Sequence, residues 1–294
     1  MVRTYYFNPA IDNVLPGREI VNALQEQEQT FNAHNNALNV ETFFRDVLEH
    51  SLEDEGAEVY ISSIMCVEDP QPNYQEDNCA YWHDHLQQAF FGQCFIQNDE
   101  LRSLAIAQDI VAHEFGHGLT SWTAKLVYKD ESGALDESFA DIFAIFVANY
   151  NPNIDIWKNI REWNWEIGRG FGQNGQAIRD LSSPSTYNHP EHMNNYEDLA
   201  HDHGGVHFNC GIHNKAAYNL LTSQDNENNY LFDPESAALL FYQALIQLGE
   251  TSTFSDSRRA IQQAGKTLFR NNYNKDEKLQ AIATAFDNVG IFFE

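Results

Sequence analysis

Basic residues are scarce in this chain of 294 residues, which has 17 Lys and Arg against 43 Asp and Glu and a formal net charge of −26. An excess of negative charge of this size repels the phosphate backbone, so we expect no nucleic-acid partner. Long apolar runs are lacking too, because no uninterrupted stretch of the sequence approaches the roughly 18 residues of a membrane span. The composition therefore favours a protein that binds neither nucleic acid nor membrane.

Cysteine is also rare, and none of the four cysteines lies in a CxxC pair: Cys66, Cys79, Cys94 and Cys210. A disulfide between Cys79 and Cys94 fits an oxidising compartment, and four free thiols fit a reducing one equally well. The first 17 residues lack the apolar core of a signal peptide. A processed or trimmed chain and a cytosolic protein are both compatible with this start, and the native status of Met1 stays open.

The order of the predicted elements indicates an α+β fold with two lobes. The sequence predicts a helix over residues 30–50, a strand over 58–67, and irregular loop with a hairpin over 69–98. Loops dominate residues 149–209. A helix is predicted to begin near residue 135, after the polar stretch 130–133. Further helices are predicted at residues 101–120, 209–223, 234–248, 255–269 and 275–289. We expect a β-rich N-terminal lobe at 1–121, ending in the helix predicted at 101–120, and a mainly α-helical C-terminal lobe at 122–294.

The segment HEFGH at residues 113–117 has the spacing of a zinc site on a helix. His113 and His117 stand four residues apart, so both imidazoles lie on one helix face and can reach a single ion. Glu114 points about 100° away around the helix, where it can act on water beside the metal without being a ligand. The motif predicts a zinc centre with Glu114 as the general base.

A second predicted helix supplies the carboxylates that such a centre needs. Catalytic zinc takes three protein ligands, and Glu137 completes the set with His113 and His117 at about 2.0–2.2 Å. Asp141 can accept the free N–H of a ligating histidine. The helix is apolar nearly all round, so it is buried, and buried carboxylates need a partner or a metal.

At this point the sequence resembles the thermolysin family of zinc metallopeptidases, most closely its short, protealysin-like branch. The resemblance rests on the segments DIVAHEFGHGLTSWTAKLVY, ESGALDESFADIF, IRDLSSP, DHGGVHFNCGIHNKAAYNL and ATAFDNVGI. It covers nearly the whole chain and implies a thermolysin-like fold, one catalytic zinc ion and hydrolysis of peptide bonds. It also implies secretion, a peptide or protein substrate, and a propeptide or protein inhibitor outside this chain as a candidate partner.

The resemblance carries further roles to matching positions. Tyr128 and His207 match the pair that stabilises the oxyanion, and Asp202 matches the carboxylate that orients that histidine. Arg179 matches the arginine that binds a substrate carbonyl on the primed side. One departure concerns the edge strand, where Cys79 stands in place of an asparagine that holds substrate backbone in many members.

An apolar S1′ pocket is also implied by the resemblance. It predicts cleavage on the amino side of apolar residues, and the bulk of Phe171 favours Leu or smaller over Phe. The matching positions are Leu101, Leu104, Ile110, Ile167, Phe171 and Ile178.

The family's double calcium site is predicted to be absent. Of about five carboxylates that members gather there, only Asp109 and Glu166 remain, and the other positions hold Ala148, Asn164 and Arg169. Two calcium ions need 6–8 mostly anionic oxygen ligands each, and a guanidinium would repel them. We expect Arg169 to replace the ions by pairing with Asp109 or Glu166.

Two other functions are compatible with parts of the motif. A pseudo-enzyme would keep the fold without cleaving, but every matched catalytic position is filled. A zinc aminopeptidase uses the same HExxH logic, but it needs an acidic anchor for the substrate amine, typically in a GAMEN-like strand, which this sequence lacks.

Overall fold

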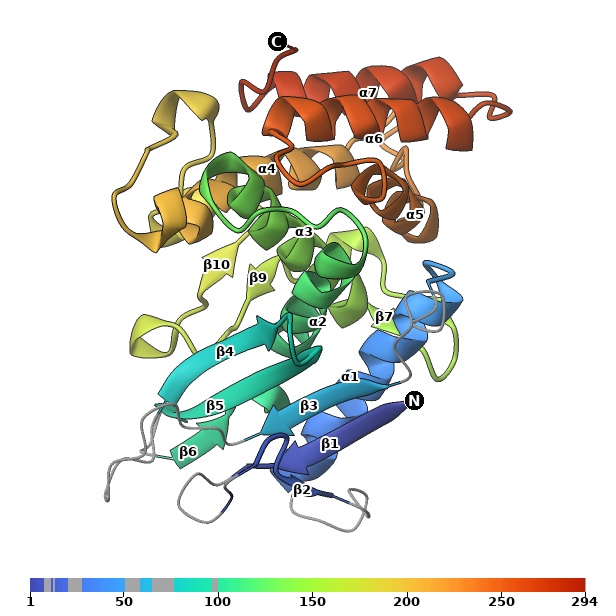
Figure 1. Cartoon of the computed structure of the whole chain (residues 1–294). Coiled ribbons are helices and arrows are strands. Elements are labelled where there is room, and N and C mark those ends of the chain that lie inside the picture. The colour runs from blue at the N-terminus through green and yellow to red at the C-terminus, as the bar shows by residue number, and fades with distance from the viewer. Residues whose placement is uncertain are drawn as a thin grey trace.

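The computed structural model describes residues 1–7, 12, 14–20, 28–50, 59–64, 77–96 and 100–293. Cys66 and the ends of the strand predicted at 58–67 lie outside these residues. A β-sheet forms the N-terminal end of the molecule and a group of helices the opposite end, with α2 (Gln108–Trp122) and α3 (Asp130–Ala148) between them (Figure 1). This arrangement is the two-lobed α+β fold that the sequence predicts.

The sheet has the strand order β2-β1-β3-β5-β4, and β6 also pairs with β5. Its central pairs β1–β3 and β3–β5 are parallel, whereas β2, β4 and β6 join antiparallel. Strand β4 lies at one end of this order and pairs only with β5 among the described strands. The strands are β1 Val2–Tyr6, β2 Arg18–Glu19, β3 Tyr60–Ile64, β4 Asp77–His83, β5 Gln88–Ile96 and β6 Glu100–Ser103.

The helix predicted at residues 101–120 begins later than expected. Residues 101–103 belong to strand β6, where Arg102 pairs with Cys94, and the 3-10 turn Leu104–Ile106 follows before α2. Ser103 ends the strand by accepting a hydrogen bond from the backbone N–H of Ala105 at 3.3 Å. Pairing with β5 therefore overrides the helical spacing of the apolar residues at this point.

Helix α3 begins five residues before the predicted position, because the polar stretch 130–133 is helical. Asp130 and Glu131 stand in its first turn, where negative charge is favourable. Gly133 permits a close approach, since a Cβ there would lie 2.5 Å from Val206 Cγ1 and 2.9 Å from the carbonyl carbon of Tyr128. The glycine thus brings the start of α3 against the segment that carries Tyr128.

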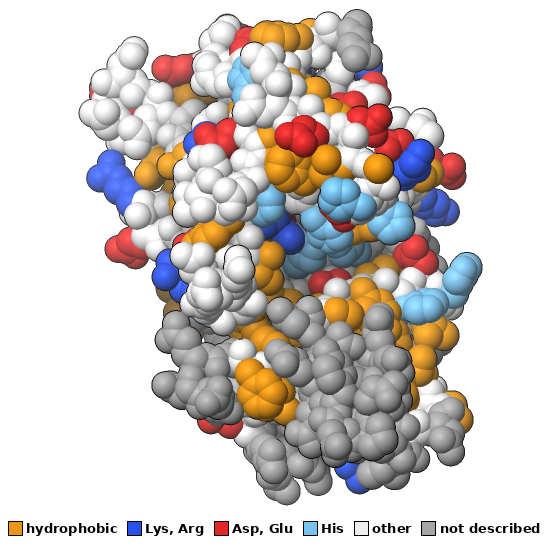
Figure 2. All heavy atoms as spheres, turned by 90° about the vertical axis from the view of Figure 1, so that its left-hand side faces the viewer, with side chains coloured by type: hydrophobic (Ala, Val, Ile, Leu, Met, Phe, Trp, Pro, Cys, Tyr) orange, Lys and Arg blue, Asp and Glu red, His pale blue; other side chains and the backbone are white. Residues whose placement is uncertain are grey.

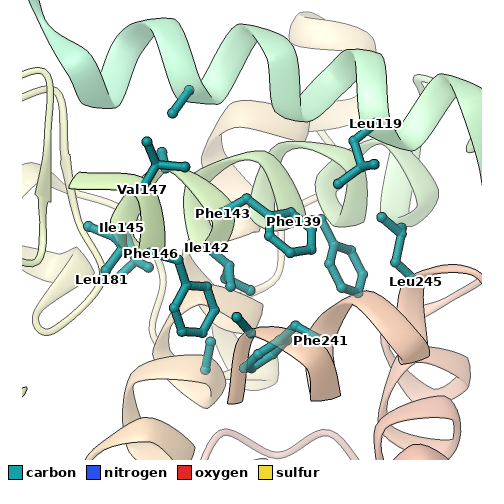
Figure 3. Close-up of a cluster of buried hydrophobic side chains, with 14 of the residues drawn as sticks. Leu119, Phe139, Ile142, Phe143, Ile145, Phe146, Val147, Leu181, Phe241 and Leu245 are labelled. Atoms are coloured by element: carbon teal, nitrogen blue, oxygen red, sulfur yellow. The ribbon is translucent and has the colours of Figure 1, made fainter. Parts of the chain in front are cut away.

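The core of the molecule is built around α3. Its Phe139, Phe143 and Phe146 are fully buried, and Phe241 of α5 packs on the same cluster (Figure 3). Helix α3 therefore contributes apolar side chains nearly all round, as predicted, and its polar residues face specific partners described below.

The remaining helices are close to their predicted ranges except the one predicted at 209–223, which begins seven residues earlier, at Asp202, with a left-handed turn at His203–Gly205. Residues 149–201 consist mostly of loops, as predicted. Among the described residues, no helix has the length and apolar character that crossing a membrane requires. The other helices are α1 Glu28–Asp46, α4 Asp202–Leu221, α5 Pro234–Leu245, α6 Phe254–Leu268 and α7 Lys275–Asp287. The short elements are β7 Tyr150–Asn151, β8 Ile156–Trp157, β9 Glu166–Ile167, β10 Arg179–Asp180, and the 3-10 turns Ile160–Glu162, Gln173–Gly175, Pro184–Tyr187 and Met193–Asn195.

Candidate metal centre and active site

Helix α2 places the two histidines of the HEFGH segment side by side. The ring centroids of His113 and His117 are 4.7 Å apart, and their Nε2 atoms are 3.1 Å apart. Glu137 comes from α3, with Oε2 at 3.5 Å from His113 Nε2 and Oε1 at 3.3 Å from His117 Nε2. One ligand atom from each of these three side chains lies within 4.8 Å of the others.

The opposite ring nitrogen of each histidine contacts a carboxylate. His113 Nδ1 lies 2.8 Å from Asp141 Oδ1, and His117 Nδ1 lies 3.0 Å from Asp136 Oδ1. An ionised carboxylate can only accept, so each Nδ1 carries its hydrogen, and in its neutral form each ring turns an Nε2 lone pair toward Glu137. Glu137 Oε2 has no hydrogen-bond partner among the described residues although it is buried.

Three converging electron-pair donors of this kind repel one another unless a cation lies between them. Two imidazoles and one carboxylate are the ligand set of many catalytic zinc sites, and carboxylates behind the histidines are their usual support. The residues present therefore fit a zinc ion.

The ionisation of the side chains also indicates a site that attracts positive charge. Burial lowers the pKa of His113, but the nearby Asp141 and Glu137 outweigh it and raise that pKa to about 9. Burial acts in the same way on His117, and Asp136 and Glu137 raise its pKa well above the ordinary value. Burial alone would raise the pKa of Glu137, yet the surrounding histidines hold it well below its usual range.

Asp136 was not predicted as a site residue. It precedes Glu137 directly, and adjacent helical residues differ in direction by about 100°, so it turns to His117 while Glu137 turns between both rings. The adjacent pair of acidic residues after a HExxH helix was the available signal.

Arg179 supports the other carboxylate. Its Nε and Nη2 donate to Asp141 Oδ2 and Oδ1 at 2.8 and 2.7 Å, and Nη2 lies 3.8 Å from Glu137 Oε2. The guanidinium is buried, with 7% of the residue exposed. Two of its donors are therefore already engaged by Asp141.

The far wall of the site is formed by Tyr128 and by His207 of α4. The Tyr128 hydroxyl donates to Glu137 Oε1 and lies 3.2 Å from His207 Nε2. His207 Nδ1 lies 2.5 Å from Asp202 Oδ1, and its backbone N–H donates to Asp202 Oδ2 at 3.0 Å. Helix α4 begins with a left-handed turn, in which Gly204 has a φ of 95°. A Cβ on Gly204 would lie 2.2 Å from a side-chain oxygen of Asp130, so only glycine fits there. The turn thus brings His207 to the wall.

A cavity of about 760 Å³ opens beside the ligand cluster. Figure 2 shows histidine side chains gathered in a hollow on this face of the molecule. Glu114 lines the cavity and is 5% exposed, and burial raises its pKa although the charges of His113 and His117 oppose this. The wall also includes Ala80, Tyr81 and Trp82 of the edge strand β4, together with Ser121, Leu126, Val127 and Tyr128.

Comparisons with known proteins agree with this geometry. Residues 15–121 match the family model described as thermolysin metallopeptidase, catalytic domain, and residues 124–291 match the model of its alpha-helical domain. The chain belongs to the thermolysin metallopeptidase family.

Individual relatives point the same way. A neutral protease NprE of Bacillus pumilus is 32% identical over 249 residues, which are 83% of this chain and 72% of that protein. A zinc metalloproteinase of Listeria monocytogenes is 35% identical over 222 residues, covering 73% of this chain and 38% of the relative. The chain spans about a third of the length of several curated relatives, among them an extracellular elastase of Staphylococcus epidermidis.

The solved structure of the protealysin precursor from Serratia proteamaculans has a similar fold. It superposes with a TM-score of 0.78 at 25% identity, over 99% of this chain and 87% of that one. The likeness places the chain in the protealysin-like branch of the thermolysin metallopeptidase family.

None of the six residues predicted for the S1′ pocket of this thermolysin-family chain is among the residues that line the cavity described above. Leu104, Ile110, Ile167 and Phe171 are buried in the core. Leu101 and Ile178 are partly buried. The cavity beside the ligand cluster is thus bounded by β4 and by the segment before α3.

The positions corresponding to the family's calcium site contain an ion pair. Arg169 Nη2 contacts Glu166 Oε2, and the Arg169 side chain is 69% exposed. Asp109 Oδ2 accepts a hydrogen bond from the backbone N–H of Gly168 at 2.6 Å. Within the described residues no ion pair joins Asp109 to Arg169, so only the Glu166 alternative of the expected pairing is present.

Three of the cysteines are free thiols: Cys79 is half-buried, whereas Cys94 and Cys210 are buried. The disulfide between Cys79 and Cys94 considered from the sequence is therefore not formed. Cys79 lies on β4 and Cys94 on the neighbouring β5.

Proposed function

We propose that this chain is a zinc-dependent endopeptidase whose metal is held by His113, His117 and Glu137. The observation that carries the proposal is the convergence of three ligand atoms at the wall of a cavity that also contains Glu114. When bound, zinc would polarise the scissile carbonyl and lower the pKa of a water molecule toward about 7.

Glu114 is the proposed general base. It lies one residue after a ligand histidine, lines the cavity and is not among the three converging ligands. Burial raises the pKa of its carboxyl, and a carboxylate with a raised pKa accepts a proton from water more readily. The same group can then pass the proton to the leaving amine.

Tyr128 and His207 are proposed to stabilise the negative charge that develops on the substrate oxygen. Both have a polar atom near Glu137, and Asp202 holds His207 through two hydrogen bonds. One donor of this kind typically contributes about 3 kcal/mol to transition-state stabilisation. In this role His207 donates from Nε2 to the substrate oxygen while Asp202 accepts from its Nδ1–H.

A peptide substrate would bind along the edge strand β4. Ala80, Tyr81 and Trp82 line the cavity, and β4 is the end strand of the described sheet. An extended peptide can add to such an edge by main-chain hydrogen bonds. Binding of this kind depends on the main chain of the substrate and not on its side chains, so it suits an endopeptidase that cleaves different sequences.

Specificity for an apolar residue on the carboxyl side of the scissile bond is a finer part of the proposal. It rests on the family resemblance and on the apolar character of the six S1′ positions, of which Ile167 is the strand partner of Arg179. Arg179 is proposed to bind a substrate carbonyl there. Absence of the double calcium site is proposed on the pair between Arg169 and Glu166.

The deciding experiment compares the natural chain with Glu114→Gln. We expect one zinc per chain in both proteins by elemental analysis, cleavage of casein by the natural chain, and loss of nearly all turnover in the variant. Substantial activity in Glu114→Gln would exclude this residue as the base. A natural chain that binds zinc without cleaving would indicate the pseudo-enzyme.

A second assay tests the kind of peptidase. An endopeptidase cleaves peptides whose amino terminus is acetylated, whereas an aminopeptidase does not. Mapping the products of an unfolded protein should show Leu and other apolar residues after the scissile bond. Dominance of Lys or Asp at that position would refute the proposed specificity.

A further inference from the structure

We propose that a buried chain of hydrogen bonds, running from Asp141 through Asn214 and Ser138 to His213 and Ser257, positions the zinc ligand His113. The inference rests on the proposed zinc site and adds positioning residues to it. Asn214 is the link that joins the chain to the carboxylate behind His113.

The contacts are short and continuous. Asn214 Nδ2 donates to Asp141 Oδ2 at 2.8 Å, and Ser138 Oγ donates to Asn214 Oδ1 at 2.7 Å. Ser138 Oγ also lies 2.7 Å from His213 Nδ1, and His213 Nε2 lies 2.8 Å from Ser257 Oγ. All five side chains are buried, with at most 1% of any residue exposed.

The chain has one consistent direction. The Asn214 oxygen can only accept, so the Ser138 hydroxyl gives its hydrogen to it and must accept from His213 Nδ1–H. His213 is then neutral with a lone pair on Nε2, which accepts from the Ser257 hydroxyl. Turning the Asn214 amide would set its oxygen against the Asp141 carboxylate, so the arrangement determines the orientation of the amide and the tautomer of the ring.

This direction ends on the carboxylate that supports a zinc ligand. Asp141 accepts from His113 and Arg179 on Oδ1 and from Arg179 and Asn214 on Oδ2. Each oxygen thus has two partners, which leaves the carboxylate one orientation. His113 follows, because its Nδ1–H points along an Asp141 lone pair and its Nε2 is thereby aimed at the metal position.

The same chain holds together the elements that build the site. Ser138 and Asp141 lie on α3, which also carries Glu137. Asn214 and His213 lie on α4, which carries His207, and Ser257 lies on α6. Packing alone would hold these helices together, but only directed bonds specify how the Asp141 carboxylate is rotated.

The test uses the full chain with two substitutions at Asn214. Asn214→Leu keeps the volume but can neither donate nor accept, and Asn214→Asp keeps an acceptor for Ser138 but faces Asp141 with a second carboxylate. Leu240→Ala is the matched control, since Leu240 is a fully buried α5 residue outside the chain of bonds. For each protein we would measure the zinc dissociation constant by competition with a chelator, and the stability of the zinc-free form.

Removal of such support typically weakens zinc binding about 10- to 100-fold. We expect that range for Asn214→Leu, a larger loss for Asn214→Asp, and an unchanged dissociation constant for Leu240→Ala at comparable loss of stability. Zinc affinity of both folded Asn214 variants within about twofold of the natural chain would overturn the proposal. So would an equal loss of affinity in the control.

If the Asn214 variants do not fold, Ser257→Ala decides the question at the far end of the chain. It leaves His213 Nε2 without its donor, so weaker zinc binding than in the natural chain supports the proposal and an unchanged dissociation constant refutes it. Failure of the natural chain to bind zinc would instead refute the proposed function, and this inference with it.

Discussion

His213 makes the stability of the protein sensitive to acid. The ring, carried by α4, is fully buried against α3, α6 and α7, and its neighbours Ser138, Ser257 and the rings of Phe139, Phe254 and Phe286 carry no charge. Burial lowers the pKa of His213 to about 3, from the ordinary value of 6.5. The folded protein therefore keeps this ring neutral at pH values where the unfolded chain takes up a proton.

The sign of the effect follows from the lowered pKa. The contribution of His213 is fully present above pH 6.5, and it falls by about 1.4 kcal/mol for each pH unit below that, because unfolding is then accompanied by proton uptake. The loss amounts to about 2 kcal/mol at pH 5 and reaches about 5 kcal/mol near pH 3. Losses of this size are a large part of the stability of an ordinary domain.

Comparison with His213→Gln isolates this contribution, since glutamine is polar and does not titrate. Both proteins would be studied in the Glu114→Gln background to prevent self-digestion, and without zinc so that metal release does not contribute. Urea unfolding would be measured between pH 7.5 and 4.5. The free energy of unfolding of the protein with His213 should fall more steeply with falling pH than that of His213→Gln. The difference between the two free energies should change by about 2 kcal/mol from pH 6.5 to pH 5. Parallel curves would refute the reasoning.

Three further predictions concern the active site and the ion pair. Asp136→Asn keeps a hydrogen-bond acceptor but removes the charge behind His117, so it should weaken zinc binding about 10-fold in a chelator competition. An unchanged zinc affinity would contradict the role of Asp136 in supporting the His117 ring. Tyr128→Phe and His207→Ala should each lower kcat/KM about 100-fold with zinc content unchanged, and a loss of zinc would instead indicate a structural role. Arg169→Ala should change the free energy of unfolding by less than about 1 kcal/mol because the pair is exposed, and zinc-saturated protein should have the same Tm in EGTA and in millimolar calcium.

The sequence alone was sufficient for the parts of the site that depend on spacing along one helix. His113 and His117 share a face because four residues make about one turn, and any stable helix over that segment brings them together. The apolar surroundings of Glu137 and Asp141 likewise required a polar or metallic partner for each carboxylate. The long amphipathic helices of the C-terminal lobe were predictable for the same reason, since their periodicity is local.

What only the tertiary structure decided is which distant groups meet. Residues 101–103 form a strand because β5 offers its edge to them, and Asp136 supports His117 because α3 crosses α2 at that point. Ser138, His213 and Ser257 have no common motif, and the sequence does not relate α3, α4 and α6 to one another. Local propensity describes one segment at a time, whereas a buried polar group is satisfied by whichever partner the packing of the helices brings within 3 Å.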